Sequence, residues 1–69
     1  MKLSARNMLK GTITDIEVGS VNAVVKVDIG DGKMLSSMIT LDAVTDMNLK
    51  VGDEVFAIIK SSNVILGTM

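Results

Sequence analysis

Apolar and polar side chains alternate through most of this chain, and this period of two restricts its fold more than any other feature. Residues Val21, Ala23, Val25, Val27 and Ile29 are apolar at successive odd positions. Successive residues of a β-strand point to opposite faces of a sheet, so this spacing predicts a half-buried strand. The odd positions should therefore face a core.

A tight turn is predicted directly after this strand. Gly30, Asp31 and Gly32 supply an Asp-Gly pair, and glycine adopts positive φ without a Cβ clash. Alternation then resumes over residues 33–41. Two alternating runs joined by such a turn form a β-hairpin.

Two further strands are predicted on either side of this hairpin. Leu9–Val18 is rich in β-branched residues, with Gly11 marking a bulge or a bend, and a turn at Gly19 and Ser20 ends it. Val55–Lys60 is apolar on both faces, which is typical of a strand at the centre of a sheet or at an interface.

A short helix and a last strand complete the predicted layout. Apolar residues three apart predict one or two helical turns within Asp42–Leu49, with Asp42 as the cap or in the first turn. A turn at residues 50–53 follows. The run Val64–Leu66 is predicted as a short final strand.

Five strands with a small helix between the third and the fourth are typical of the OB-fold barrel. The sequence therefore predicts one all-β domain over residues 1–69. A simple β-sandwich or an SH3-like barrel is the alternative.

Self-association is expected because the chain has few other means of support. It has 69 residues, 48% of them apolar, and no Cys or His. Disulfides and zinc sites are thereby excluded, and so small a chain buries little surface alone. An obligate oligomer is predicted, with a tightly packed monomer as the alternative.

Several classes of function are disfavoured by composition. Without Cys and His, thiol nucleophiles and imidazole bases are absent. Asp, Glu, Lys and Ser remain, but so small a chain offers no deep cleft to activate them, so it is not expected to be an enzyme. The net charge is −1, and the single aromatic residue, Phe56, is predicted to be a core side chain. Nucleic-acid binding needs stacking platforms and basic grooves, so it is not expected.

The predicted location is the cytoplasm, because nothing in the chain indicates a membrane or secretion. Its longest apolar run, Val55–Ile59, is far too short to span a bilayer, and no apolar leader stands near the N-terminus. The stretch Asp28–Gly32 is loosely similar to a calcium loop but lacks the distal Glu, so it is interpreted as a polar turn.

Two segments combine a cation with small polar residues and contain no carboxylate: Ser4–Asn7 and Lys60–Asn63. An oxyanion only accepts hydrogen bonds, so its site must consist of donors. These segments are therefore candidates for anion binding. An alternative interpretation is that both are polar because they face water.

The motif Ser4-Ala5-Arg6-Asn7, followed by Leu9-Lys10-Gly11, resembles the opening of the molbindin (Mop) family of small molybdate-binding proteins. The likeness continues through residues 21–25, 39–44 and 58–64. It implies an OB-fold module that exchanges its N-terminal strand with a neighbour. It also implies a homo-hexamer, a trimer of dimers, with oxyanion sites between subunits.

The resemblance also implies the residues of the site. The main site would use the first motif, Thr40 and the end of the fourth strand: Ser4, Ala5, Arg6, Asn7, Thr40, Lys60 and Ser61. Some members have a second hydroxyl where this chain has Ala43, so a backbone N–H would replace it. A second site is assigned to the turn formed by Gly19, Ser20, Val21 and Asn22.

The function implied is storage and homeostasis of molybdenum, with molybdate or tungstate held by donors from two subunits. Arg6 of one chain would then meet Lys60 of another, and the anion would relieve their repulsion. No organic cofactor, no nucleic acid and no membrane is expected as a partner. The alternative is a non-catalytic OB-fold module that binds RNA or another protein.

Overall fold

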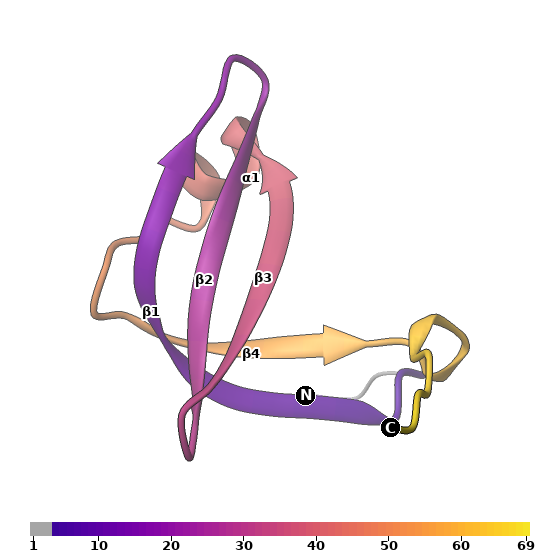
Figure 1. Ribbon diagram of the computed structural model, residues 1–69. Coiled ribbons are helices and arrows are strands. Elements are labelled where there is room, and N and C mark those ends of the chain that lie inside the picture. The colour runs from indigo at the N-terminus through magenta and orange to yellow at the C-terminus, as the bar shows by residue number, and fades with distance from the viewer. Residues whose placement is uncertain (1–3) are drawn as a thin grey trace.

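Four antiparallel strands and one short helix make up the fold in residues 4–69, the part of the chain that the computed structural model describes. The elements are β1 (Asn7–Val18), β2 (Asn22–Gly30), β3 (Lys33–Thr40), α1 (Leu41–Asp46), β4 (Glu54–Ile59) and a 3₁₀ turn, η1 (Ser61–Asn63). All four strands belong to one sheet in the order β3-β2-β1-β4. The sheet curls into half of a barrel (Figure 1). The all-β class, with the helix between the third and fourth strands, is confirmed, and a two-sheet sandwich is not.

Strand β1 joins two parts of the molecule because it pairs with different partners along its length. Its first half pairs with β4, from Asn7↔Ile59 to Thr12↔Glu54, and its second half pairs with β2 up to Val18↔Ala23. Between them β1 bends sharply, so that its first half and β4 form a two-stranded ribbon extending from the body (Figure 1). This structure describes a single chain, so strand exchange stays a prediction.

Gly11 directly precedes Thr12, where the pairing of β1 changes from β4 to β2, and its role is close backbone approach. A Cβ there would lie 2.6 Å from Cγ1 of Val27 and 2.7 Å from the carbonyl oxygen of Asp28. The irregularity in the β1–β2 ladder falls between Ile13 and Asp15. The bulge therefore lies a few residues after Gly11, and a bend at Gly11 itself stays a prediction.

The hairpin between β2 and β3 is confirmed. Gly30 pairs with Lys33, which leaves Asp31 and Gly32 as the loop, and their φ angles are 53° and 73°. Two positive φ angles define the mirror-image turn that matches the twist of paired strands. The pairing shifts between Asp28 and Gly30, so the turn and this irregularity together set the register of the ladder from Asp28↔Met34 onward. That register decides which residues face the core.

The small core confirms the alternation. Ile13, Ala23, Val25 and Val27 are buried, and Ile29 is partly buried. The prediction is wrong for Val21, which precedes β2 and is 68% exposed in the turn.

Helix α1 begins one residue earlier than predicted and is shorter. Its N-cap is Thr40, whose Oγ1 accepts the backbone N–H of Ala43 at 3.1 Å. Asp42 lies in the first turn, where it favours the helix electrostatically. Of the two roles predicted for Asp42, the first-turn position is therefore the one observed.

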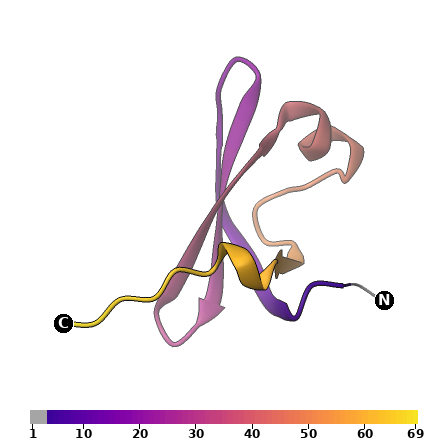
Figure 2. The same ribbon diagram turned by 90° about the vertical axis from the view of Figure 1, so that its right-hand side faces the viewer.

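Two predictions for the C-terminal part of the chain are wrong. Strand β4 lies at an edge of the sheet, so of its two predicted placements the centre is excluded and the interface stays a prediction. Phe56 is 51% exposed and is not a core residue in the single chain. Val64–Leu66 forms no strand, and residues 64–69 follow η1 as a tail without regular structure (Figure 2). Four strands are observed instead of five.

Candidate functional site

The β1–β4 ladder brings the two cationic segments to one end of the ribbon. Its last pair is Asn7↔Ile59, and the antiparallel register continues to Arg6 and Lys60 as the next positions. These residues are about fifty apart in sequence and adjacent in the fold. The register therefore brings the ends of the two cationic segments together within one chain, while the meeting of Arg6 with Lys60 of another chain stays a prediction.

Asn7 ties the two segments together. Its side-chain Nδ2 donates to the carbonyl oxygen of Ile59 at 3.2 Å, and the residue is half-buried. Asn7 and Ile59 are the neighbours of Arg6 and Lys60 in the sequence, so this bond supports the β1–β4 register at the end that carries both cations. Asn7 was predicted as an anion donor, and in this structure one of its amide N–H groups is already used.

The other candidates at the ribbon end are open to an incoming anion. Ser4, Arg6, Lys60 and Ser61 are exposed, and Ala5 is half-buried. Residues 55–69 contain no Asp or Glu. The nearest carboxylate of the ladder belongs to Glu54, at the far end of β4, where it pairs with Lys10 at 3.7 Å. The ribbon end therefore carries positive charge and hydroxyl donors without a competing Asp or Glu side chain.

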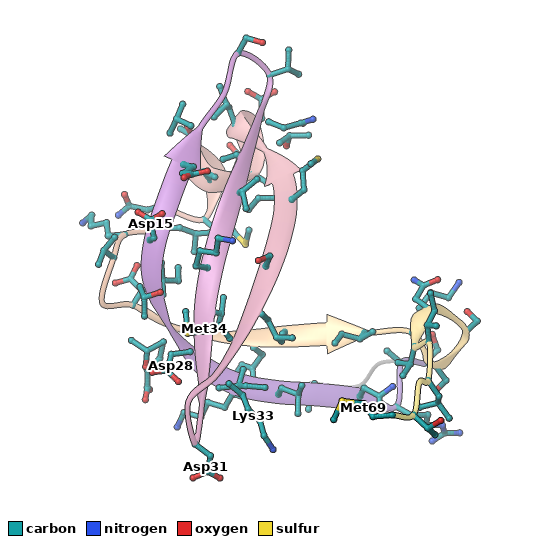
Figure 3. All side chains as sticks on the ribbon, in the orientation of Figure 1. Asp15, Asp28, Asp31, Lys33, Met34 and Met69 are labelled. Carbon is teal, nitrogen blue, oxygen red and sulfur yellow. The ribbon has the colours of Figure 1, made fainter. Side chains whose placement is uncertain are left out.

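Thr40 lies at the opposite end of β1 from this cluster. It pairs with Asn22 in the β2–β3 ladder, beside the turn that follows β1. In Figure 3, the labelled Met69 lies near the ribbon end, and the part of the sheet next to α1 lies at the other end of the molecule. One chain therefore does not bring Thr40 to Arg6 and Lys60.

The hydroxyl of Thr40 is oriented by the helix that it caps. Because Oγ1 accepts the N–H of Ala43, the hydroxyl proton is free to be donated elsewhere. The same bond occupies the Ala43 N–H, which was expected to replace the missing second hydroxyl. That N–H is not available to an anion in this conformation.

The turn assigned to the second site is well defined but carries no cation. Gly19 N–H donates to the Asn22 carbonyl at 2.8 Å. The turn borders an open groove of about 370 Å³, whose lining includes Glu17 and contains no Lys or Arg. A single chain thus provides polar groups there, and any positive charge would have to come from another chain.

Nothing in residues 4–69 suggests a site for a metal cation. No group of three or more His, Cys, Asp or Glu side chains in this range could hold one. Asp28 instead accepts the N–H of Gly30 at 2.8 Å through its Oδ1. This bond confirms that the Asp28–Gly32 stretch is a polar turn. Within the same range, no helix is long and apolar enough to cross a membrane.

Comparison with known proteins decides the family, because the TOBE domain model matches residues 3–66. The chain belongs to the TOBE domain family. A relative from Haemophilus influenzae, named "Probable molybdenum-pterin-binding protein", is 57% identical over 67 residues, which is 97% of each chain. The predicted likeness to the Mop proteins is confirmed.

Solved structures of similar proteins agree with this TOBE assignment. A molybdate-binding protein from Sporomusa ovata superposes with a TM-score of 0.92 at 37% identity, over 99% of this chain and 100% of that one. ModG, described as a cytoplasmic molybdate-binding protein and solved with molybdate bound, gives a TM-score of 0.95 at 48% identity. The match covers 100% of this chain and 49% of ModG, so the chain spans about half of that protein.

Sequence reasoning missed two features of the site. The first is the clamp from Asn7 to Ile59, because a hydrogen bond across 52 positions leaves no local pattern. The second is the capping role of Thr40. A Thr directly before a short helical pattern is a recognised N-cap signal, so this role could have been found.

Proposed function

We propose that this protein binds molybdate, and tungstate as a close analogue, in a binding role rather than a catalytic one. The observation that supports this proposal is the last pair of the β1–β4 ladder, Asn7↔Ile59, which adjoins Arg6 and Lys60 at a ribbon end without Asp or Glu side chains. The names of its relatives support molybdate as the ligand. Storage of the oxyanion inside the cell is the physiological role that we infer.

We infer further that the complete site needs more than one chain. The ribbon end supplies Ser4, Arg6, Lys60 and Ser61, with Ala5 allowing close approach of the backbone. The hydroxyl of Thr40 would come from a neighbouring chain, since it lies far from Arg6 in its own. A homo-hexamer built as a trimer of dimers fits this requirement. It would also bring several Gly19–Asn22 turns together at the second site.

Calorimetric titration of the purified protein with molybdate, tungstate, sulfate and phosphate tests the proposal. Tight binding of the first two is expected. Sulfate is smaller and should bind more weakly in a cavity fitted to molybdate. Phosphate often carries a proton near neutral pH that needs an acceptor, and the ribbon end offers no Asp or Glu side chain for it. Equal or absent binding of all four anions would refute the proposal.

The variant Arg6→Ala tests the site itself. One charged hydrogen bond contributes about 1.5–3 kcal/mol, so the affinity for molybdate should fall by about ten- to a hundredfold or slightly more. Lys33→Ala is the matched control, because Lys33 is an exposed cation at the hairpin, away from the ribbon end (Figure 3). If both variants lose affinity equally, net charge rather than the site explains the binding.

A binding module for RNA or protein is the competing function. The argument that Phe56 is buried and so cannot stack on a base no longer holds, since Phe56 is half-exposed. It remains the only aromatic residue of the chain, and stacking platforms for several bases are absent. Titration with an oligonucleotide at two salt concentrations checks this point, because a steep salt dependence would favour the alternative.

A further inference from the structure

All the sulfur of this chain belongs to methionine, since it has six Met and no Cys. Of the methionines within the strands, Met38 in β3 has the largest exposed fraction, 70%, against 50% for Met34 and 47% for Met8. Peroxide converts an exposed thioether to a sulfoxide, which cells reduce again to the thioether. Met38 is therefore the strand methionine that is most accessible to such an oxidant.

The sulfur of Met38 also accepts a hydrogen bond, from the side-chain Nδ2 of Asn22 at 3.9 Å. The two residues are diagonal neighbours on one face of the sheet, because Asn22 pairs with Thr40 and Met38 lies two residues before Thr40. This is the outer face, since Ala23 and Val25, which point to the other face, are buried. The contact therefore lies across the sheet from the core.

The Asn22 side chain is held only loosely by this contact. A thioether sulfur is a weak acceptor, and both side chains are exposed, so the amide is free to turn to a better acceptor. Asn22 and Met38 both line the open groove of about 370 Å³ at the Gly19–Asn22 turn. Because no Lys or Arg lines this groove, the amide N–H groups of Asn22 are important donors for an oxyanion there.

Oxidation of Met38 changes the acceptor that Asn22 meets. The Sδ atom attacks one oxygen of hydrogen peroxide, an S–O bond forms as the O–O bond breaks, and the second oxygen leaves with both protons as water. The sulfur is oxidised by two electrons and the peroxide is reduced by two. The new oxygen occupies a lone pair of the sulfur, and such a lone pair is what accepts the Asn22 N–H in the thioether. A sulfoxide oxygen is a much stronger acceptor, so it holds the amide firmly.

We propose that Met38 is a site of reversible oxidation by peroxide, and that its sulfoxide binds the Asn22 side chain and withdraws this donor from an anion at the Gly19–Asn22 turn. Reduction of the sulfoxide returns the donor to the turn. The effect on the anion rests on the second site proposed above. The oxidation and the new hydrogen bond do not depend on molybdate, so they are tested separately.

Hydrogen peroxide treatment without molybdate tests the first part of the proposal. Peptide mass spectra should place the added oxygen on Met38 earlier than on Met34 or Met8, in the order of their exposed fractions. In the NMR spectrum, the side-chain amide signals of Asn22 should shift as Met38 is oxidised. They should return when a methionine sulfoxide reductase is added. Oxidation of Met38 no faster than that of Met8 would overturn the proposal.

Three variants assign the NMR response to one sulfur. Met38→Leu has no thioether at this position, so its Asn22 signals should not respond to peroxide. Met38→Gln carries a permanent amide oxygen and should shift them without peroxide. Met34→Leu is the matched control, because Met34 lies on the same face of β3 but opposite Asp28 (Figure 3), and it should respond like the native protein. Asn22 signals that stay constant in the native protein, or shift equally in Met38→Leu, contradict the proposal.

Molybdate titration before and after peroxide treatment tests the second part. Loss of one hydrogen bond to a charged group lowers affinity about tenfold or more. The affinity of one class of site should fall by this factor in the native protein and in Met34→Leu, and stay constant in Met38→Leu. An equal fall in Met38→Leu would assign the effect to another methionine and refute the proposal. If no variant binds molybdate before peroxide, the proposed function fails, and the Asn22 signals still decide whether Met38 acts on this turn.

Discussion

Replacing Gly11 by Ala should destabilise the fold, although the change adds only one methyl group. The new Cβ would lie 2.6 Å from Cγ1 of Val27 and 2.7 Å from the carbonyl oxygen of Asp28. Real Cβ contacts are not this short, so β1 must move away from β2 at the bend. Val27 cannot give way easily, because it is 4% exposed and belongs to the core.

The size of the effect follows from two opposing contributions. Overpacking of a core costs about 1–3 kcal/mol, and the upper part of this range applies because one contact is with backbone. Loss of glycine flexibility in the unfolded chain returns about 0.4–1 kcal/mol. The free energy of unfolding should therefore fall by about 2 kcal/mol, which lowers the melting temperature by roughly 8–16 °C for a domain of this size.

Urea unfolding of native and Gly11→Ala protein at one fixed chain concentration measures the change. A double-mutant cycle with Val27→Ala assigns the cause, because removal of Cγ1 opens space for the new methyl group. The double variant should lose less stability than the two single variants added together. A Gly11→Ala protein as stable as the native one would refute the close-approach argument.

Two smaller effects follow from other contacts. Thr40→Val removes the N-cap of α1 and should lower the free energy of unfolding by about 1 kcal/mol, measured by thermal unfolding. Thr40→Ser keeps the hydroxyl and should lower it much less. Equal losses of stability in the two variants would contradict the capping role. Lys10→Ala should change the stability by less than about 0.5 kcal/mol, since the Lys10–Glu54 pair is 3.7 Å apart with side chains 62% and 70% exposed. A larger loss for Lys10→Ala would indicate a role for this cation beyond the ion pair.

The parts of the fold that the sequence predicts well are those determined by neighbouring residues. The alternation at Val25 and Val27 identifies the core face, and the Asp31-Gly32 pair identifies the hairpin turn, because strand geometry and positive φ act locally. The placement of Phe56 depends on which strands flank β4, which is a property of the whole sheet. Its apolar neighbours therefore predicted burial that a single chain does not provide.

The prediction for Val64–Leu66 fails for a related reason. Its composition favours a strand, but a strand exists only where another strand offers hydrogen bonds. In residues 4–69 that partner is missing, and the segment stays exposed. The preference of Val64–Leu66 for a strand is therefore local, whereas its pairing depends on the rest of the sheet.

The site shows the same division between local and long-range information. The donor types in Ser4–Asn7 and Lys60–Ser61 are evident from composition, while their meeting depends on the β1–β4 register. Thr40 lies beside the other end of β1. The path along this strand of twelve residues is about 36 Å long. No local rearrangement of one chain can close that separation.

Molybdate binding and assembly should therefore be coupled. If Arg6 and Lys60 of one chain and Thr40 of another hold the same anion, molybdate binds the assembled protein and not the separate chains. Ligand at a hundred times its dissociation constant then stabilises each such contact by about 2.7 kcal/mol. The concentration at which the chains dissociate should fall when molybdate is added, and in Arg6→Ala it should not respond. Dissociation that is insensitive to molybdate in the native protein would place the whole site within one chain and leave Thr40 with its capping role alone.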